Sequence, residues 1–138
     1  MKEHPSDSNV AAVRPIYDAW GAGDWSAGPE VYGPGMVWSW SDEFPDIAGV
    51  YDRPDDANKA LRSWLSGWER WRCEAERFLA SGDRVVVFTR YRGAGRGGLE
   101  LETPAAHVWT LHDGRATRLD VYLDPDRALR EAGLPPDA

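Results

Sequence analysis

The chain has 138 residues, of which 42% are hydrophobic and eight are tryptophan, and this is sufficient for one domain with a substantial core. The formal net charge of −7, with no cluster of lysines and arginines, argues against nucleic acid as a partner, because phosphate binding requires concentrated positive charge. One cysteine, three scattered histidines (His4, His107 and His112) and the lack of a long apolar run predict no disulfide, no metal site, no cofactor and no membrane span, so we expect a soluble cytoplasmic protein.

The first predicted element is a helix over residues 8–20. Ser8 is placed to cap it, and apolar residues recur at helical spacing along one side. Pro15 predicts a kink rather than an end, because the apolar stripe continues beyond it. The glycines and prolines of residues 24–35 then predict an irregular segment before the first strand.

The middle of the chain predicts a strand, a loop and a tryptophan-rich helix. Alternation over residues 36–41 places Trp38 and Trp40 on one face of the strand. An acidic loop, residues 42–46, follows, and a helix is expected over residues 54–71. Short connections then predict a series of antiparallel strands. These strands are expected at residues 72–80, 84–92, 99–111 and 115–123.

The last third of the chain, residues 102–134, is the most informative part. Strand alternation gives His107 a face that it shares with apolar residues such as Trp109, so a titratable group points where core side chains are expected. A short final helix follows, capped by Asp124 and ended by Gly133. This segment therefore predicts both a hairpin and a polar group inside the domain.

Several short motifs recur in a fixed order along the chain. They are Ala19-Trp20 with Gly23-Asp24-Trp25, Pro45-Asp46 with Gly49-Val50-Tyr51, Gly82-Asp83-Arg84 followed by three valines, Arg92 to Gly97, and His107 to Leu111 with Asp113-Gly114-Arg115 and Tyr122. Their order and spacing resemble the SnoaL-like, ketosteroid-isomerase-like branch of the nuclear transport factor 2-like superfamily. The resemblance implies one α+β domain over residues 1–138, with its core at about 8–134. In this fold a cone-shaped, curved antiparallel sheet wraps around the N-terminal helices and leaves a pocket, and a homodimer is expected.

The resemblance also locates the catalytic positions of the family. The general-base aspartate of ketosteroid isomerase falls on Trp40, and the catalytic aspartate of limonene epoxide hydrolase falls on Val121, so neither base is present. The isomerase's protonated aspartate falls on His107, which could keep the role of hydrogen-bond donor to a developing oxyanion. The arginine-aspartate pair of the hydrolase falls on Arg90 and Arg92, so only the arginine is kept.

The catalytic candidates are therefore His107 as donor or general acid and base, Arg90 as a stabiliser of negative charge, and Glu43 as a substitute base. The alternatives are a satisfied core histidine, ion pairs of the arginines with Glu102, Asp120 or Glu43, and an exposed acidic loop. Ligand-binding candidates share a predicted pocket face or a family position. They are Tyr17, which lies one residue from the isomerase's oxyanion tyrosine, and Trp38, Trp40, Phe88, Arg92, Trp109 and Val121.

The remaining aromatic and polar residues leave two questions open. Trp64, Trp68 and Trp71 recur at helical spacing and are interpreted as core packing. Asp120 and Tyr122 face either the pocket or a dimer interface, depending on which side of their strand is buried. The favoured function is an enzyme that binds a hydrophobic, aromatic or polycyclic small molecule and catalyses isomerisation, cyclisation or hydration by proton transfer. The alternatives are a non-catalytic ligand-binding module and a dimerisation domain with a filled core.

Overall fold

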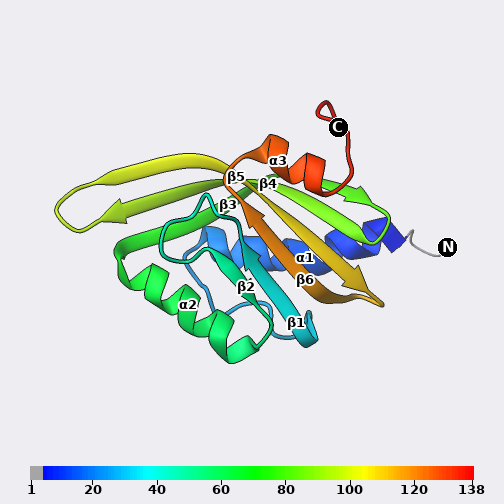
Figure 1. The fold of residues 1–138 in the computed structure, drawn as a ribbon, viewed down its shortest axis with the longest axis horizontal. Coiled ribbons are helices and arrows are strands. Elements are labelled where there is room, and N and C mark those ends of the chain that lie inside the picture. Colours follow the sequence, from blue (N-terminus) through cyan, green and yellow to red (C-terminus); the bar gives the residue numbers. More distant parts are fainter. Residues whose placement is uncertain (1–4) are drawn as a thin grey trace.

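Figure 1 shows the computed structural model of the protein, which describes residues 5–138. The elements are, in chain order, α1 (Pro5–Gly21), β1 (Tyr32–Trp40), β2 (Gly49–Tyr51), α2 (Pro54–Ser66), β3 (Trp68–Ser81), β4 (Arg84–Gly95), β5 (Glu100–His112), β6 (Arg115–Tyr122) and α3 (Pro125–Glu131). The helices α1 and α2 pack on one face of a curved sheet, and α3 packs on the other. Within the described residues no helix is long and apolar enough to span a membrane.

The six strands form one open sheet in the order β2-β1-β6-β5-β4-β3. The expected α+β fold is confirmed, and four of its strand pairs are antiparallel. The pair of β1 and β6 is parallel, which makes the sheet mixed. This pairing is possible because β2, α2, β3, β4 and β5 all intervene between the two strands, whereas a hairpin connection would impose the antiparallel direction.

The structure corrects the boundary between the second helix and the strand that follows. The helix α2 ends at Ser66, before Gly67, so Trp68 and Trp71 belong to β3 and not to the helix. Their rings lie over Gly93 of the neighbouring strand, where a Cβ atom would come within 2.8 Å of Trp71 and 2.9 Å of Trp68. The tryptophans therefore pack across the sheet, and Gly93 provides the space for them.

The core lies between α1 and the concave face of the sheet. The helix α1 continues through Pro15, and its buried side contributes Val13, Ile16, Tyr17 and Trp20. A second, smaller cluster forms under α3 on the convex face, where Ala128 and Leu129 cover the β-strand residues Val86, Ala106 and Val108. The central strands are therefore buried on both faces along part of their length.

Candidate ligand-binding site

A small cavity, here called the inner cavity, lies between α1, α2 and the concave face of the sheet, and its volume is about 30 Å³. On the same measure one water molecule needs roughly 10–15 Å³, so the inner cavity holds about two. Its walls are largely aromatic, and none of the residues that line it is an acid, a lysine or an arginine. They are Trp20, Trp25, Trp38, Trp40, Phe44, Ile47, Leu61, Trp64, Trp71, Tyr91, His107, Leu119 and Val121.

Strand register brings the floor of the inner cavity together. His107 of β5 lies opposite Val121 of β6, and Val121 lies opposite Trp40 of β1. The three side chains therefore form a row across neighbouring strands on the concave face. The three positions at which the family resemblance places catalytic groups are therefore neighbours on the concave face.

His107 is buried within a chain of hydrogen bonds. The Tyr17 hydroxyl lies 2.6 Å from Nδ1 of His107, and the Tyr91 hydroxyl lies 2.6 Å from Nε2. The indole Nε1 of Trp109 donates to the Tyr17 hydroxyl over 2.6 Å. Both ring nitrogens of the histidine are thus occupied by tyrosines, of which Tyr91 lines the inner cavity and Tyr17 does not.

Burial keeps this chain uncharged near neutral pH. It lowers the pKa of His107 from 6.5 to about 3 and raises the pKa values of Tyr17 and Tyr91 well above their ordinary value. A neutral imidazole donates through one nitrogen and accepts through the other. The histidine is therefore a neutral hydrogen-bonding group in the folded protein near pH 7, and its lowered pKa makes it a weak general base.

The pattern of donors assigns the tautomer of His107. With the proton on Nε2, Tyr17 donates to Nδ1, Nε2 donates to the Tyr91 oxygen, and the hydroxyl hydrogen of Tyr91 is free to point into the inner cavity. With the proton on Nδ1, the unused hydrogen would belong to Tyr17, which does not line the cavity. Among Tyr17, His107 and Tyr91, the first tautomer leaves no donor unpaired outside the inner cavity, so we assign it.

A second donor at the inner cavity is unused. Trp20 lines the cavity and is 4% exposed, and its Nε1 has no hydrogen-bond partner among the described residues. An unsatisfied buried donor costs about 1–3 kcal/mol. An acceptor oxygen bound in the inner cavity would offset part of this cost.

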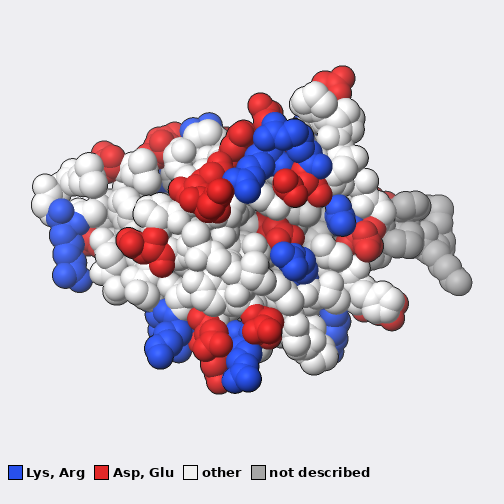
Figure 2. Space-filling view, viewed as in Figure 1, with Lys and Arg blue, Asp and Glu red and all other residues white. Residues whose placement is uncertain are grey.

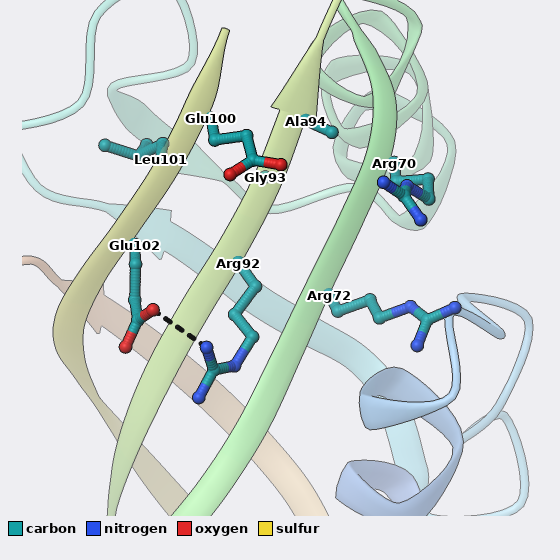
Figure 3. Close-up of a pocket in the computed structure, with 8 residues that line it drawn as sticks. All are labelled: Arg70, Arg72, Arg92, Gly93, Ala94, Glu100, Leu101 and Glu102. Atoms are coloured by element: carbon teal, nitrogen blue, oxygen red, sulfur yellow. Dashed lines mark hydrogen bonds and ion pairs between the residues drawn. The ribbon is translucent and has the colours of Figure 1, made fainter. Parts of the chain in front are cut away.

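Four predicted site residues do not lie where the sequence placed them relative to His107. Phe88, Arg90 and Arg92 do share one face, but it is the convex face, because Tyr91 between them points inward. Arg90 pairs with Glu76 and Glu102, and Arg92 pairs with Glu74 and Glu102. Figure 3 shows Arg92 and Glu102 paired over a separate hollow of about 380 Å³, which shares no lining residue with the inner cavity.

Glu43 is the fourth of these residues, and its hydrogen bonds connect two segments of the chain. Its carboxylate accepts hydrogen bonds from the Ser41 hydroxyl over 2.6 Å and from the backbone N–H groups of Leu123 and Asp124 over 3.2 and 2.9 Å. It does not line the inner cavity. Glu43 therefore ties the loop after β1 to the end of β6 and is not placed as a base.

Other candidates divide between the two faces. Trp38 lines the inner cavity, whereas Trp109 and Tyr17 lie behind His107 and hold it. Asp120 pairs with Arg118, and Tyr122 packs against the cluster under α3, so both belong to the convex face.

His4 lies outside the described residues. Among residues 5–138 no group of three or more His, Cys, Asp or Glu side chains is arranged to hold a metal ion.

Sequence reasoning missed Tyr91, the residue that presents a hydroxyl to the inner cavity. The available signal was the alternation of side chains along the strand. Tyr91 is on the same face as Val85, Val87 and Thr89, all of which are buried. It also interpreted Trp64 and Trp71 as core packing alone, although both line the inner cavity.

Comparison with known proteins identifies a family and several similar structures. A model of the SnoaL-like domain matches residues 13–119. A search of curated proteins gives no significant match.

Several solved structures share the fold. An NTF2-like protein of unknown function from Burkholderia pseudomallei K96243 is 24% identical, covers 89% of this chain and 95% of its own, and has a TM-score of 0.75. TerC, co-crystallized with polyporic acid, is 23% identical, covers 90% and 96%, and has a TM-score of 0.75. A candidate SnoaL-like polyketide cyclase from Jannaschia sp. CCS1 is 23% identical, covers 98% of both chains, and has a TM-score of 0.75.

Proposed function

The chain belongs to the SnoaL-like domain family, and from that premise we propose that it binds a small, uncharged aromatic molecule in the inner cavity. The observation that supports this best is the combination of uncharged aromatic walls with unused hydrogen-bond donors. Apolar sites with a few placed polar groups are typical of small-ligand binding. The chemistry of this lining suits a ligand with a flat ring and at least one acceptor oxygen, and the cavity, about 30 Å³ in volume, has to widen to admit such a ring.

The polar end of the inner cavity defines how that oxygen is held. Tyr91 donates its hydroxyl hydrogen to the ligand, while Nε2 of His107 donates to the Tyr91 oxygen. Hydrogen bonds in such a chain polarise one another, which strengthens the terminal donor. The Trp20 N–H is a second donor for the same ligand oxygen or for a neighbouring one. By analogy of fold alone, TerC, which was co-crystallized with polyporic acid, supports the binding of an aromatic ligand by a protein of this fold.

A second proposed function is proton-transfer catalysis, that is, isomerisation, cyclisation or hydration. The observation that favours it is the continuous chain from Tyr91 through His107 to Tyr17, which can stabilise negative charge on a ligand oxygen. The lining residues include no carboxylate, so the base in such a reaction would be water or a group of the ligand itself. Binding therefore has stronger support than catalysis.

Family membership also leads us to propose a homodimer. Equilibrium sedimentation at micromolar concentration is expected to give twice the mass of the chain. A monomer at that concentration would contradict the proposal without affecting ligand binding.

The binding function is tested with a ligand series and one conservative variant. At a hundred times its dissociation constant a ligand should stabilise the protein by about 2.7 kcal/mol, which a thermal-shift screen of aromatic ketones, phenols and polyporic acid would detect. Tyr91→Phe removes the terminal donor and is expected to weaken binding of oxygen-bearing ligands by about threefold to tenfold. The measurement is a dissociation constant from fluorescence titration.

Two controls accompany this test. Tyr32→Phe removes a hydroxyl that donates to the Ala27 carbonyl and lies outside the inner cavity, so it should leave affinity unchanged. Ligand analogues without the oxygen should bind equally to the parent protein and to Tyr91→Phe. If no compound stabilises the parent protein, the proposed binding function is wrong.

A further inference from the structure

A much larger hollow, here called the outer cleft, lies on the surface beside the inner cavity, and its volume is about 940 Å³. It is bounded by α2, by the loop between β1 and β2, and by the end of the β4–β5 hairpin, which projects beyond the rest of the sheet (Figure 1). Cavities of about 300–1,000 Å³ are the usual size of small-ligand sites. The inner cavity alone is far smaller than a ring system, so the two volumes have to be considered together.

The inner cavity and the outer cleft have two wall residues in common, Ile47 and Trp64. Ile47 is 2% exposed, and its carbonyl accepts a hydrogen bond from the Tyr51 hydroxyl over 2.9 Å, which fixes this part of the loop. Trp64 is half-buried, and its ring meets those of Phe44 and Trp71 edge-on at 6.2 and 5.4 Å. These two side chains are all that the two volumes share.

Trp64 is the wall residue that is easier to move. It stands on α2, in which Ala57 is the one buried residue. Its ring borders the outer cleft on one side, so the ring can rotate into unoccupied volume there. A change between staggered rotamers would give up the ring contacts of Trp64 with Phe44 and Trp71 and open the wall between the two volumes.

The outer cleft differs from the inner cavity in being polar. Its lining includes Asp46, Asp56, Lys59 and Arg96, and these four side chains form no ion pair or hydrogen bond with one another or with other described residues. Two acidic and two basic groups sum to zero charge, which fits an uncharged group with many donors and acceptors better than a phosphate or a carboxylate. Figure 2 shows acidic and basic side chains mixed over this face of the molecule, with no single-sign patch.

We propose that the inner cavity and the outer cleft are two compartments of one ligand site, with Trp64 as the movable wall between them. The ligand is an elongated molecule whose flat aromatic ring enters the inner cavity and whose hydroxyl-rich, uncharged part stays in the outer cleft. This inference rests on the proposed binding function. It adds a second compartment and a residue that determines which ligands enter.

The test uses 4-hydroxyacetophenone, its 4-O-β-D-glucoside and its phosphate ester as probes. Each presents the same ring and carbonyl oxygen, and they differ in what would remain in the outer cleft. The glucoside is expected to bind about fivefold more tightly than the parent ketone, whereas the phosphate ester is not. The double variant Asp56→Ala/Lys59→Ala should abolish this preference and leave the affinity for the ketone unchanged.

The role of Trp64 is tested by rates. Stopped-flow fluorescence should show association about tenfold faster in Trp64→Ala, because binding no longer waits for the ring to move. Leu99→Ala removes an exposed apolar side chain that lines the outer cleft alone, so its association rate should match that of the parent protein. Trp64→Leu keeps an apolar side chain on α2 and repeats the measurement if Trp64→Ala is too unstable.

The outcomes separate this inference from the function on which it rests. Equal affinity for ketone and glucoside, or an unchanged association rate in both Trp64 variants, overturns the two-compartment site while ketone binding still supports the proposed function. Failure of all three probes to bind to the parent protein and to Trp64→Ala overturns both.

Discussion

Replacing Tyr17 with phenylalanine is expected to lower the free energy of unfolding by about 3 kcal/mol, because it leaves two buried polar groups without partners. The hydroxyl of Tyr17 accepts from the Trp109 indole and pairs with Nδ1 of His107. Both groups are buried, with Trp109 0% and His107 2% exposed. Urea denaturation at pH 7 measures the change.

Tyr122→Phe is the matched control for Tyr17→Phe. The Tyr122 hydroxyl has no hydrogen-bond partner among the described residues, and its ring stays under the Arg127 guanidinium, 5.6 Å away, in the variant. Its free energy of unfolding should change by no more than about 0.5 kcal/mol. Similar losses in the two variants would mean that the hydrogen-bond chain contributes nothing specific to stability.

Acid is expected to destabilise the protein through His107. The pKa of this histidine is about 3 in the folded state and 6.5 when exposed, so between these values the unfolded chain takes up a proton that the folded chain does not. The contribution of His107 is therefore complete above pH 6.5 and is lost as the pH falls toward 3. The loss approaches about 1.4 kcal/mol per pH unit, or about 2.5 kcal/mol between pH 6.5 and 4.5.

Comparison of two histidine variants isolates this effect from the titration of carboxylates. His107→Gln should have a shallower dependence of unfolding free energy on pH between pH 6.5 and 4.5. The slope is expected to fall by about 1.4 kcal/mol per pH unit. His112→Gln changes an exposed residue at the end of β5 and should keep the slope of the parent protein. The same slope in all three proteins would show that His107 is not buried in neutral form.

Local signals in the sequence were sufficient to predict turns and helix caps, because there one residue type decides the backbone conformation. Asp113 and Gly114 both adopt positive φ, 50° and 77°, as their two-residue hairpin turn requires. The Asp124 side chain accepts from the backbone N–H of Asp126 over 3.0 Å and caps α3 as expected. The three-residue strand β2 lacks such a signal, because so short a segment shows no periodicity.

The site was harder to predict, because it depends on which face of a strand is covered. Alternation correctly grouped Phe88 with Arg90 and Arg92 but could not tell the concave face from the convex one, since Val85, Val86 and Val87 are all buried. Val86 is buried by α3, an element about 40 residues later in the chain. Likewise, the contact between Tyr91 and His107 follows from the register of β4 on β5, which no local pattern encodes.

The parallel pairing of β1 with β6 has a consequence for the order in which the protein assembles. Trp40 lies beside Val121, and Trp38 beside Leu119, although about 80 residues separate each pair in the chain. Contacts of such long range form late, because the intervening chain must first be ordered. During synthesis on the ribosome, the two tryptophans of β1 therefore remain without their partners until nearly the entire polypeptide has emerged. The inner cavity is therefore one of the last parts of the molecule to form.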